Sequence, residues 1–150
     1  MRAVVQRVTR GAVQVEGATV GEVGRGLVVL LGILRDDAPS DTEWMTKKLL
    51  GLRIFSDDEG KMNRSVVEVG GAILLISQFT VCADVGKGNR PSFMAAMPPD
   101  DARRVLEQVR EVLAASVPVA TGSFGAHMEV ALVNDGPVTI WLDSRARTSS

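Results

Sequence analysis

The sequence is poor in the residues on which most hydrolases and redox proteins depend. It has no tyrosine, one histidine and one cysteine in 150 residues. A single cysteine cannot form an internal disulfide, which fits a chain that folds in a reducing compartment. The sequence also contains no Gly-x-Ser-x-Gly turn, no His-Glu-x-x-His helix and no Walker loop. These absences argue against a zinc mechanism and against a serine triad.

Long hydrophobic runs and a strong charge of either sign are also missing. The longest apolar stretches, 27–34 and 72–76, are far shorter than the roughly 20 residues of a membrane-spanning helix, and no signal peptide is visible. The formal net charge is −1, whereas proteins that bind nucleic acid indiscriminately usually have a strongly basic domain. We therefore expect a soluble cytoplasmic protein without membrane contact, and the near-neutral charge still allows a local basic rim.

The residues that are present predict an α+β fold. Hydrophobic residues make up 45% of the chain, and a chain of this length needs neither disulfides nor metal to fold as one domain. Apolar residues at helical spacing predict one helix that begins with Ser40 as its cap and ends at Gly51, and a second over 102–113. We therefore expect a mostly antiparallel or mixed sheet with these two helices packed on it, which is the α+β class. Strands are expected at 2–8, 12–15, 19–23, 27–34, 52–55, 117–121, 126–133 and 139–143, and a hairpin at 65–69 and 72–81.

One short stretch, NDGPVT at 134–139, lies between two strand patterns. Asp-Gly between alternating runs is a strong hairpin signal. Pro137 follows at once, at the start of the next strand, where proline cannot donate to a ladder. A turn is therefore expected, and these residues alone leave open whether the backbone is displayed for binding.

Few side chains qualify as catalytic groups. His127 shares a predicted strand face with Glu129 and Ala131, which favours a solvent-facing role over that of a general base. Cys82 has no base near it in the sequence and is expected to be a small buried residue. SQFT at 77–80 places polar side chains at the end of a buried strand, which fits a pocket floor. The same four residues also fit a strand that frays into its loop, and spacing alone slightly favours this.

A glycine-rich basic loop, GKGNRPSF, occupies 86–93. Its backbone amides together with Lys87 and Arg90 could hold a phosphate. It lacks the spacing of a P-loop, so the pattern alone favours a flexible surface loop.

Six motifs taken in order resemble the D-aminoacyl-tRNA deacylase family from residue 1 to about 144: MRAVVQRV, LRIFSDDEGKMNRSV, SQFT, KGNRPSF, GSFGAHM and NDGPVT. SQFT and GPVT at their relative positions are the specific pair. The resemblance implies one domain over 1–144, a homodimer, and a sheet closed into a barrel-like shape. It also implies a hydrolase that releases D-amino acids, and glycine carried by the wrong tRNA, from tRNA. The tail at 145–150 has no apolar period and is expected to fray.

The resemblance also assigns a role to the dipeptide Gly136-Pro137. In the family its bond is cis, and it reaches from one subunit into the pocket of the other. By resemblance, Arg7 holds the orientation of the dipeptide, and Met128 and Ala102 line the pocket. A fixed backbone that collides with any L side chain rejects L substrates whatever their size, but it cannot reject glycine.

The resemblance makes Thr80 the natural candidate for a nucleophile, but no residue adjacent in the sequence is a base that would activate it. We instead expect Ser77, Gln78, Phe79 and Thr80 to position the ester and its oxyanion. The vicinal hydroxyl of the terminal adenosine would then assist attack by water, with no metal and no cofactor.

The chain departs from the family pattern directly after SQFT. The family usually reads Leu-Tyr-Ala-Asp there, and this chain reads VCAD at 81–84. Any adenosine contact made by that tyrosine is therefore not available here.

A tRNA substrate would give Lys87 and Arg90 a partner, and we expect them to contact it.

Two alternatives to the hydrolase stay open at this point. The missing acid–base groups and the near-neutral charge also fit a non-catalytic module that binds tRNA ends or a small ligand at a dimer interface. A purely structural dimer is the third hypothesis.

Overall fold

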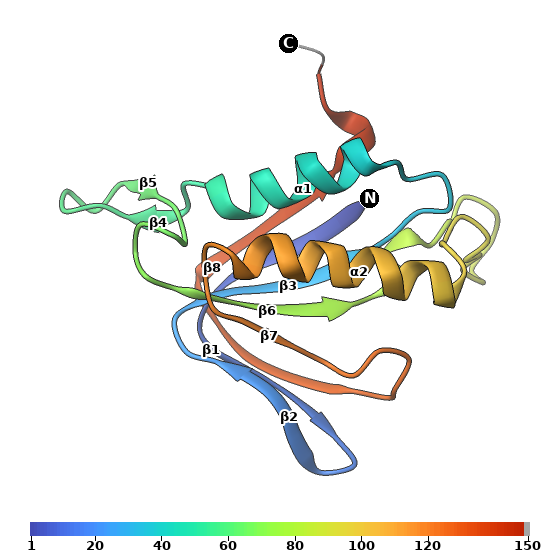
Figure 1. Ribbon diagram of the computed structural model, residues 1–150, viewed down its shortest axis with the longest axis horizontal. Coiled ribbons are helices and arrows are strands. Elements are labelled where there is room, and N and C mark those ends of the chain that lie inside the picture. The colour runs from blue at the N-terminus through green and yellow to red at the C-terminus, as the bar shows by residue number, and fades with distance from the viewer. Residues whose placement is uncertain (149–150) are drawn as a thin grey trace.

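The computed structural model describes residues 1–148, and Figure 1 shows how its elements are arranged. A six-stranded mixed sheet has the order β2-β1-β3-β6-β7, and β8 pairs with β1. A separate two-stranded ribbon contains β4 and β5. The strands are β1 (Arg2–Val15), β2 (Ala18–Val23), β3 (Gly26–Gly32), β4 (Phe55–Ser56), β5 (Met62–Arg64), β6 (Ala72–Ser77), β7 (Val119–Thr121) and β8 (Glu129–Asp143). The helices are α1 (Pro39–Gly51), α2 (Pro99–Ala114) and the short 3-10 helices η1 (Phe79–Cys82) and η2 (Ser144–Ala146).

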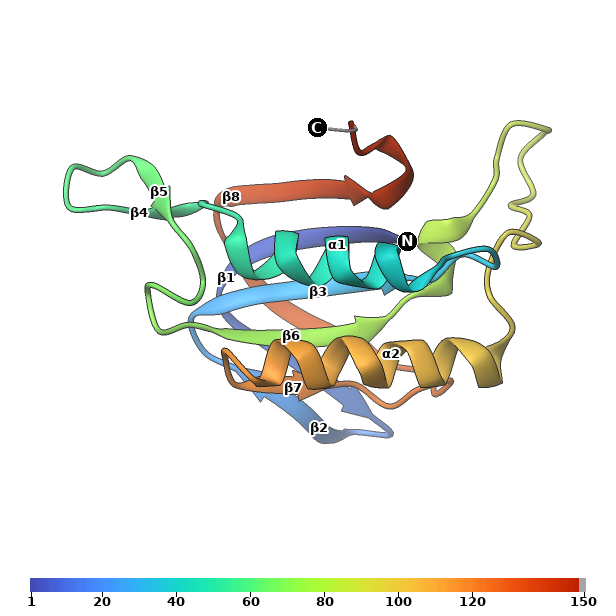
Figure 2. The ribbon, with the colours of Figure 1, turned by 45° about the horizontal axis from the view of Figure 1, so that its top comes forward.

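Both long helices cover the same face of the sheet, as Figures 1 and 2 show. Alternate residues of the central strands β3 and β6 point to opposite faces. One set, which includes Val29 and Leu75, packs under the helices against residues such as Leu49 and Leu113. The other set, which includes Leu74, forms a second cluster on the far face. Burial on both faces explains why these two strands are apolar throughout.

The two edges of the sheet approach each other. A Cβ atom added to Gly21 of β2 would lie 2.1 Å from the carbonyl oxygen of Thr121 in β7, so the two backbones are in contact there. The sheet is therefore nearly closed into a barrel. The predicted fold class, α+β with a mixed barrel-like sheet and two packed helices, is confirmed.

The expected hairpin at 134–139 is wrong, because β8 runs without a break from Glu129 to Asp143 beside β1. The pairing shifts register on both sides of Val8, and the NDGPVT segment of β8 lies opposite these irregularities. Within the segment, the Asn134 side chain accepts a 2.9 Å hydrogen bond from the N–H group of Val138. The long partner strand β1 thus outweighs the local preference for a turn, and the turn residues form a bulge instead.

Several other expected strands differ from the structure. Residues 66–70 form turns, so β6 has no hairpin partner and instead pairs in parallel with β3. The segments 2–8 and 12–15 form one strand, because β8 pairs along almost the whole of β1. The strand expected at 52–55 shortens to Phe55–Ser56.

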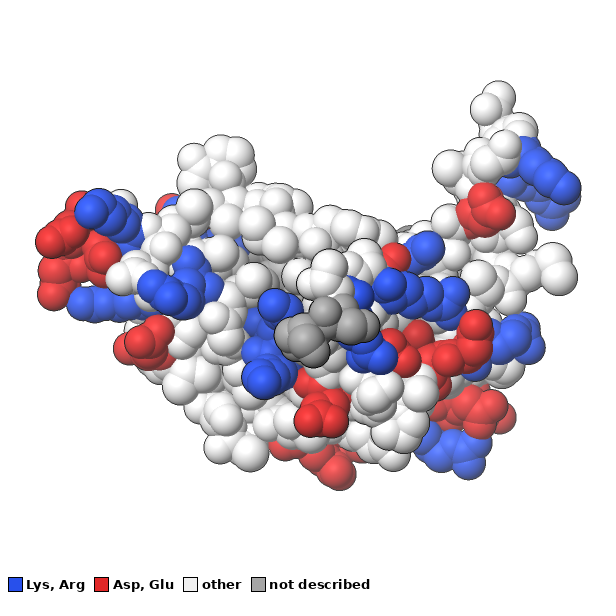
Figure 3. Space-filling model, turned by 90° about the horizontal axis from the view of Figure 1, so that it is seen from above, with Lys and Arg blue, Asp and Glu red and all other residues white. Residues whose placement is uncertain are grey.

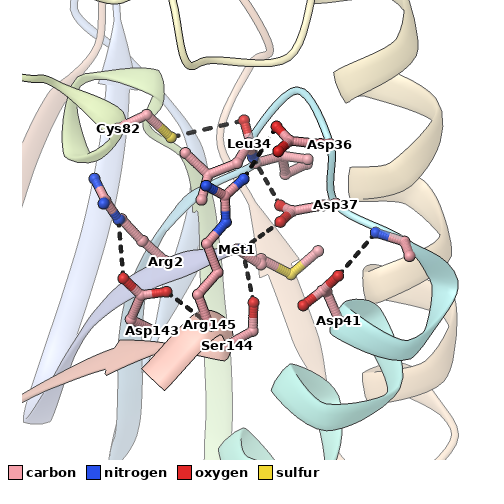
Figure 4. A network of polar contacts seen from close by, with 12 residues as sticks. Met1, Arg2, Leu34, Asp36, Asp37, Asp41, Cys82, Asp143, Ser144 and Arg145 are labelled. Carbon is pink, nitrogen blue, oxygen red and sulfur yellow. Dashed lines mark hydrogen bonds and ion pairs between the residues drawn. The ribbon is translucent and has the colours of Figure 1, made fainter. Parts of the chain in front are cut away.

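The start of α1 is held by a polar network, drawn in Figure 4. The amino group of Met1 is buried, lies 2.5 Å from Asp37 Oδ1 and donates a 2.8 Å hydrogen bond to the hydroxyl of Ser144. Ser40 is not the helix cap as predicted. The helix begins at Pro39, and the carboxylate of Asp41 accepts a 2.8 Å hydrogen bond from the N–H group of Ala38.

The chain after β8 makes several polar contacts with the start of α1. Ser144–Ala146 form η2, and Arg145 lies 3.1 Å from Asp36. Arg147 donates a 3.0 Å hydrogen bond to the carbonyl oxygen of Ser40. Residues 149 and 150 of the predicted tail lie outside the described residues. In the described part of the chain, no helix is both long and apolar enough to span a membrane.

Candidate active site

A cavity of about 670 Å³ lies at the carboxyl ends of the parallel strands β3 and β6. Ligands commonly bind in the crevice outside the carboxyl ends of parallel strands. The cavity is lined from the end of β6 by Ser77, Gln78 and Phe79, from α2 by Ala102, and from the segment before β8 by Met128. The structure therefore brings together five of the residues that the sequence nominated.

The SQFT motif does not continue the strand as an extended segment. β6 ends at Ser77, and the chain enters η1 at Phe79. The N–H group of Gln78 still donates to the carbonyl oxygen of Leu31 in β3, at 2.8 Å, which anchors the turn to the sheet. The side-chain amide of Gln78 donates a hydrogen bond to the hydroxyl of Thr80. Both side chains are therefore fixed by the turn and not by strand alternation.

The turn leaves two backbone donors available beside the cavity. The N–H groups of Phe79 and Thr80 make no hydrogen bond to any residue in 1–148, as is usual for the first N–H groups of a helix. Phe79 is 56% exposed, and its ring packs edge-on against Phe93 with centroids 5.0 Å apart. An exposed aromatic ring next to free N–H groups suits a ligand with a planar group and a carbonyl oxygen.

Gly32 is a residue that sequence reasoning missed. A Cβ atom at this position would lie 2.3 Å from Val81 Cγ2, 2.7 Å from Cys82 Sγ and 3.1 Å from the carbonyl oxygen of Gln78. Only glycine therefore lets η1 pack this closely on the end of β3. A glycine in an otherwise apolar strand is the one signal that could have revealed it.

Cys82 is buried, as predicted. Its thiol faces the carbonyl oxygen of Ile33 at 3.6 Å, and burial, the largest influence, raises the pKa of the thiol. A thiol that stays protonated and is covered by protein is not a nucleophile.

Arg7, Gly136 and Pro137 do not line the cavity that contains Ser77 and Gln78. Gly136 and Pro137 are exposed, and the peptide bond between them is cis. Within one copy of the chain, the structure therefore places the dipeptide apart from the SQFT motif.

Arg7 nevertheless contacts the segment that carries the dipeptide. Its side chain is only 12% exposed, and its Nε donates a 3.0 Å hydrogen bond to the carbonyl oxygen of Asp135. Its Nη1 donates a 2.7 Å hydrogen bond to the carbonyl oxygen of Ile54. Arg7 thus ties the residue before Gly136 to the strand-like segment that follows α1.

The predicted basic loop projects from the body of the molecule between η1 and α2, as Figure 2 shows. Its base is closed by two reciprocal 2.8 Å backbone hydrogen bonds between Asp84 and Ser92. Lys87 and Arg90 are exposed and do not line the cavity, whereas Phe93 of the same loop does. Charges of both signs are mixed over the face shown in Figure 3, in line with the net charge of −1.

His127 is exposed and lines the cavity, but it precedes β8 and is not in a strand as predicted. Among residues 1–148, no three His, Cys, Asp or Glu side chains are grouped so that they could hold a metal ion. Of the polar SQFT side chains, Ser77 and Gln78 line the cavity, whereas Thr80 does not line it and is held beside it by Gln78.

Comparison with known proteins gives a consistent result over the whole chain. A family model described as D-Tyr-tRNA(Tyr) deacylase matches residues 4–143. A protein named D-aminoacyl-tRNA deacylase from Chloroherpeton thalassium is 56% identical over 146 residues, which cover 96% of each chain. A protein of the same name from Geobacter sulfurreducens is 51% identical over 151 residues, which cover 100% of this chain and 99% of the relative.

Two solved structures share the fold. The structure titled c-Myc DNA Unwinding Element Binding Protein has a TM-score of 0.91 and 44% identity, and the match covers 95% of this chain and 98% of that chain. The structure titled as a probable eukaryotic D-amino acid tRNA deacylase has a TM-score of 0.79 and 21% identity, with 94% and 97% covered.

Proposed function

The chain belongs to the D-Tyr-tRNA(Tyr) deacylase family, and from that premise we propose that it hydrolyses the ester bond between a D-amino acid and tRNA. It would act in the cytoplasm, where tRNA is used, and remove wrongly charged amino acids before translation. The observation that carries this proposal is the cavity at the ends of β3 and β6, because Ser77, Gln78 and Phe79 of the SQFT motif line it. Glycine carried by the wrong tRNA is a second substrate.

The chemistry follows from the donors at the cavity. An aminoacyl ester is more reactive than an amide, so positioning and charge stabilisation supply much of what its hydrolysis needs. Water attacks the carbonyl carbon, and the free N–H groups of Phe79 and Thr80 donate to the oxyanion that forms. The C–O bond to the ribose then breaks, and the ribose oxygen takes up a proton. The vicinal hydroxyl of the terminal adenosine assists the proton transfer, in place of a side-chain base.

Selection of the D configuration would come from Gly136 and Pro137 of a second copy of the chain. Neither residue lines the cavity of its own copy, so the dipeptide reaches a substrate only across a homodimer interface. Apolar side chains of β8 are exposed in a single copy: Val130 at 37%, Val133 at 40% and Trp141 at 53%. Exposed apolar side chains along one strand are typical of a surface that another protein covers.

The test compares tRNA charged with D- and L-forms of the same amino acid. Purified protein should release the D-amino acid and leave the L-aminoacyl-tRNA intact, and sedimentation should give the mass of a dimer. Equal rates on both forms would contradict selection by the dipeptide. Tight, strongly salt-dependent tRNA binding without ester cleavage would instead support the non-catalytic binding module.

A further inference from the structure

A second cavity, of about 410 Å³, adjoins the candidate active site between α2, the end of β7 and the segment that precedes β8. Three residues line both cavities: Ser77, Phe124 and Met128. An elongated ligand whose reacting end occupies the first cavity could therefore extend directly into the second.

The second cavity is rich in arginine. Arg103, Arg104 and Arg110 line it, and Glu107 is the only acidic side chain among the lining residues, all of which lie within 1–148. Arg103, Glu107 and Arg110 are spaced by four and three residues, so they share one face of α2. A chain with a net charge of −1 thus concentrates positive charge in a cavity next to its site.

The three arginines differ in what they contact. Arg104 pairs with Asp101, and Arg110 Nε lies 2.9 Å from both carboxylate oxygens of Glu107. Arg103 makes no ion pair with any residue in 1–148, and its guanidinium lies 4.8 Å from the centroid of the Phe124 ring. Stacking on an aromatic face orients a guanidinium without using its hydrogen-bond donors. Arg103 is therefore held in place with its donors available to a ligand.

We propose that this arginine cavity binds a phosphodiester group of the polynucleotide next to the terminal nucleoside, with Arg103 as its principal ligand. The proposal rests on the proposed function, because it takes the 3′ end of tRNA as the molecule in the first cavity. A phosphodiester joins the 5′ oxygen of the terminal nucleoside to the nucleotide before it, so one must lie close to that nucleoside. The planar fork of an arginine matches phosphate oxygens in pairs.

The rest of the lining fits the same ligand. Leu75, Leu106 and Met128 supply apolar surface, which lowers the local dielectric and strengthens a charge-assisted hydrogen bond. The hydroxyls of Ser123 and Thr121 are further lining groups that are able to donate to phosphate oxygens. The loop residues Lys87 and Arg90 do not line this cavity.

The test measures hydrolysis of two substrates by the wild type and by Arg103→Ala: D-aminoacyl-tRNA, and the D-aminoacyl ester of adenosine, which has no phosphodiester. We expect the variant to raise KM for the tRNA substrate about tenfold, the usual effect of one lost charge-assisted hydrogen bond. This increase should be confined to the tRNA substrate, with kcat unchanged. Arg103→Lys keeps the positive charge but loses the planar guanidinium, so its KM for the tRNA substrate should lie between those of the wild type and Arg103→Ala. Lys61→Ala, which removes an exposed charge from the distant β4–β5 ribbon, is the matched control.

Binding of uncharged tRNA, followed by fluorescence anisotropy over a range of salt concentrations, gives a readout independent of catalysis. Removal of one contact to a single-stranded phosphate should reduce the slope of log K against log salt by about 0.7. An unchanged slope and an unchanged KM would overturn the proposal, as would an equal rise in KM for the adenosine ester. If the wild type hydrolyses neither substrate, the proposed function fails, and the salt slope alone decides whether Arg103 contacts phosphate.

Discussion

The side-chain amide of Gln78 donates a hydrogen bond to the hydroxyl oxygen of Thr80, across the single residue Phe79. This bond fixes the threonine side chain and occupies one of its acceptor positions. No carboxylate or imidazole within residues 1–148 is hydrogen-bonded to the same hydroxyl. A threonine held in this way is placed to position a substrate, but no base prepares it to attack one.

Substitution of Thr80 by alanine should therefore lower kcat for D-aminoacyl-tRNA by about 10- to 100-fold, or about 1.4–2.8 kcal/mol, the range of a lost positioning hydrogen bond. Single-turnover hydrolysis measures this directly, and Thr19→Ala on the exposed strand β2 serves as the control. A fall of about six orders of magnitude, or about 8 kcal/mol, would show that Thr80 is the nucleophile after all.

Substitution of Gly136 by alanine should weaken discrimination between D and L substrates. Gly136 has φ +135°, and an added Cβ atom would lie 2.8 Å from Val138 Cγ2 and 3.2 Å from Arg7 Nη2. The segment must shift to relieve these contacts, so the ratio of kcat/KM for D and L substrates should fall by about tenfold or more. Gly60→Ala is the matched control, because Gly60 has φ +77° but no atom near its added Cβ. Unchanged discrimination in Gly136→Ala would remove the dipeptide from the mechanism.

Substitution of Gly32 by alanine should lower both the stability of the protein and its activity, because Gly32 lies under η1. The added Cβ would overlap Val81 and Cys82, so η1 must move away from β3. We expect a loss of about 1–3 kcal/mol in the free energy of unfolding, as for other overpacked cores, together with lower kcat. Urea denaturation and the hydrolysis assay test both effects. Gly51→Ala, at an open position at the end of α1, should leave activity unchanged, and an equal loss of activity there would contradict the argument.

The stability of the protein should depend on pH through Asp41. Burial, the largest single influence, opposes ionisation of this carboxyl group. The hydrogen bonds from Ala38 and Ser144 and the positive charges of the amino terminus and Arg147 outweigh it, so the pKa of Asp41 is lowered from 3.8. A lowered pKa in the folded state means that ionised Asp41 stabilises the fold above about pH 4, and that this contribution disappears as the pH falls through the folded pKa.

Asp41→Asn should accordingly cost about 1 kcal/mol at pH 7, because the variant loses the negative charge that faces the amino terminus, Arg147 and the start of the helix. The difference between variant and wild type should shrink in acid. Chemical denaturation of both proteins at pH 7 and pH 3 gives the comparison. An equal difference at the two pH values would show that the carboxylate charge does not matter there.

The sequence predicted the positions of the helices and central strands better than it predicted how the strands pair. Helical spacing located α1 and α2, and the two-sided apolar runs located β3 and β6, because these signals depend on burial alone. The pairing of β6 with β3 in parallel could not be predicted, since it depends on where the crossover through α1 returns the chain. The hairpin prediction for the NDGPVT segment was wrong for the same reason, because the partner strand β1 is more than a hundred residues away in the sequence.

For the site, the sequence identified the side chains but not their surroundings. Ser77, Gln78 and Phe79 of SQFT line one cavity with Ala102 and Met128, yet nothing local in the sequence revealed that Gly32 supports them. The contact between Gln78 and Thr80 also arises from η1, which a strand pattern does not show. Arg103 and Phe124 were not identified, because they come from different elements and meet only in the folded chain.

The pairing of the first strand with the last has a consequence for synthesis on the ribosome. β8 begins only at Glu129, and until it emerges the whole length of β1 lacks one neighbour. At roughly 5–20 residues per second, this interval lasts on the order of ten seconds. A nascent chain that stalls before residue 129 presents a long unpaired strand edge, which is a template for aggregation.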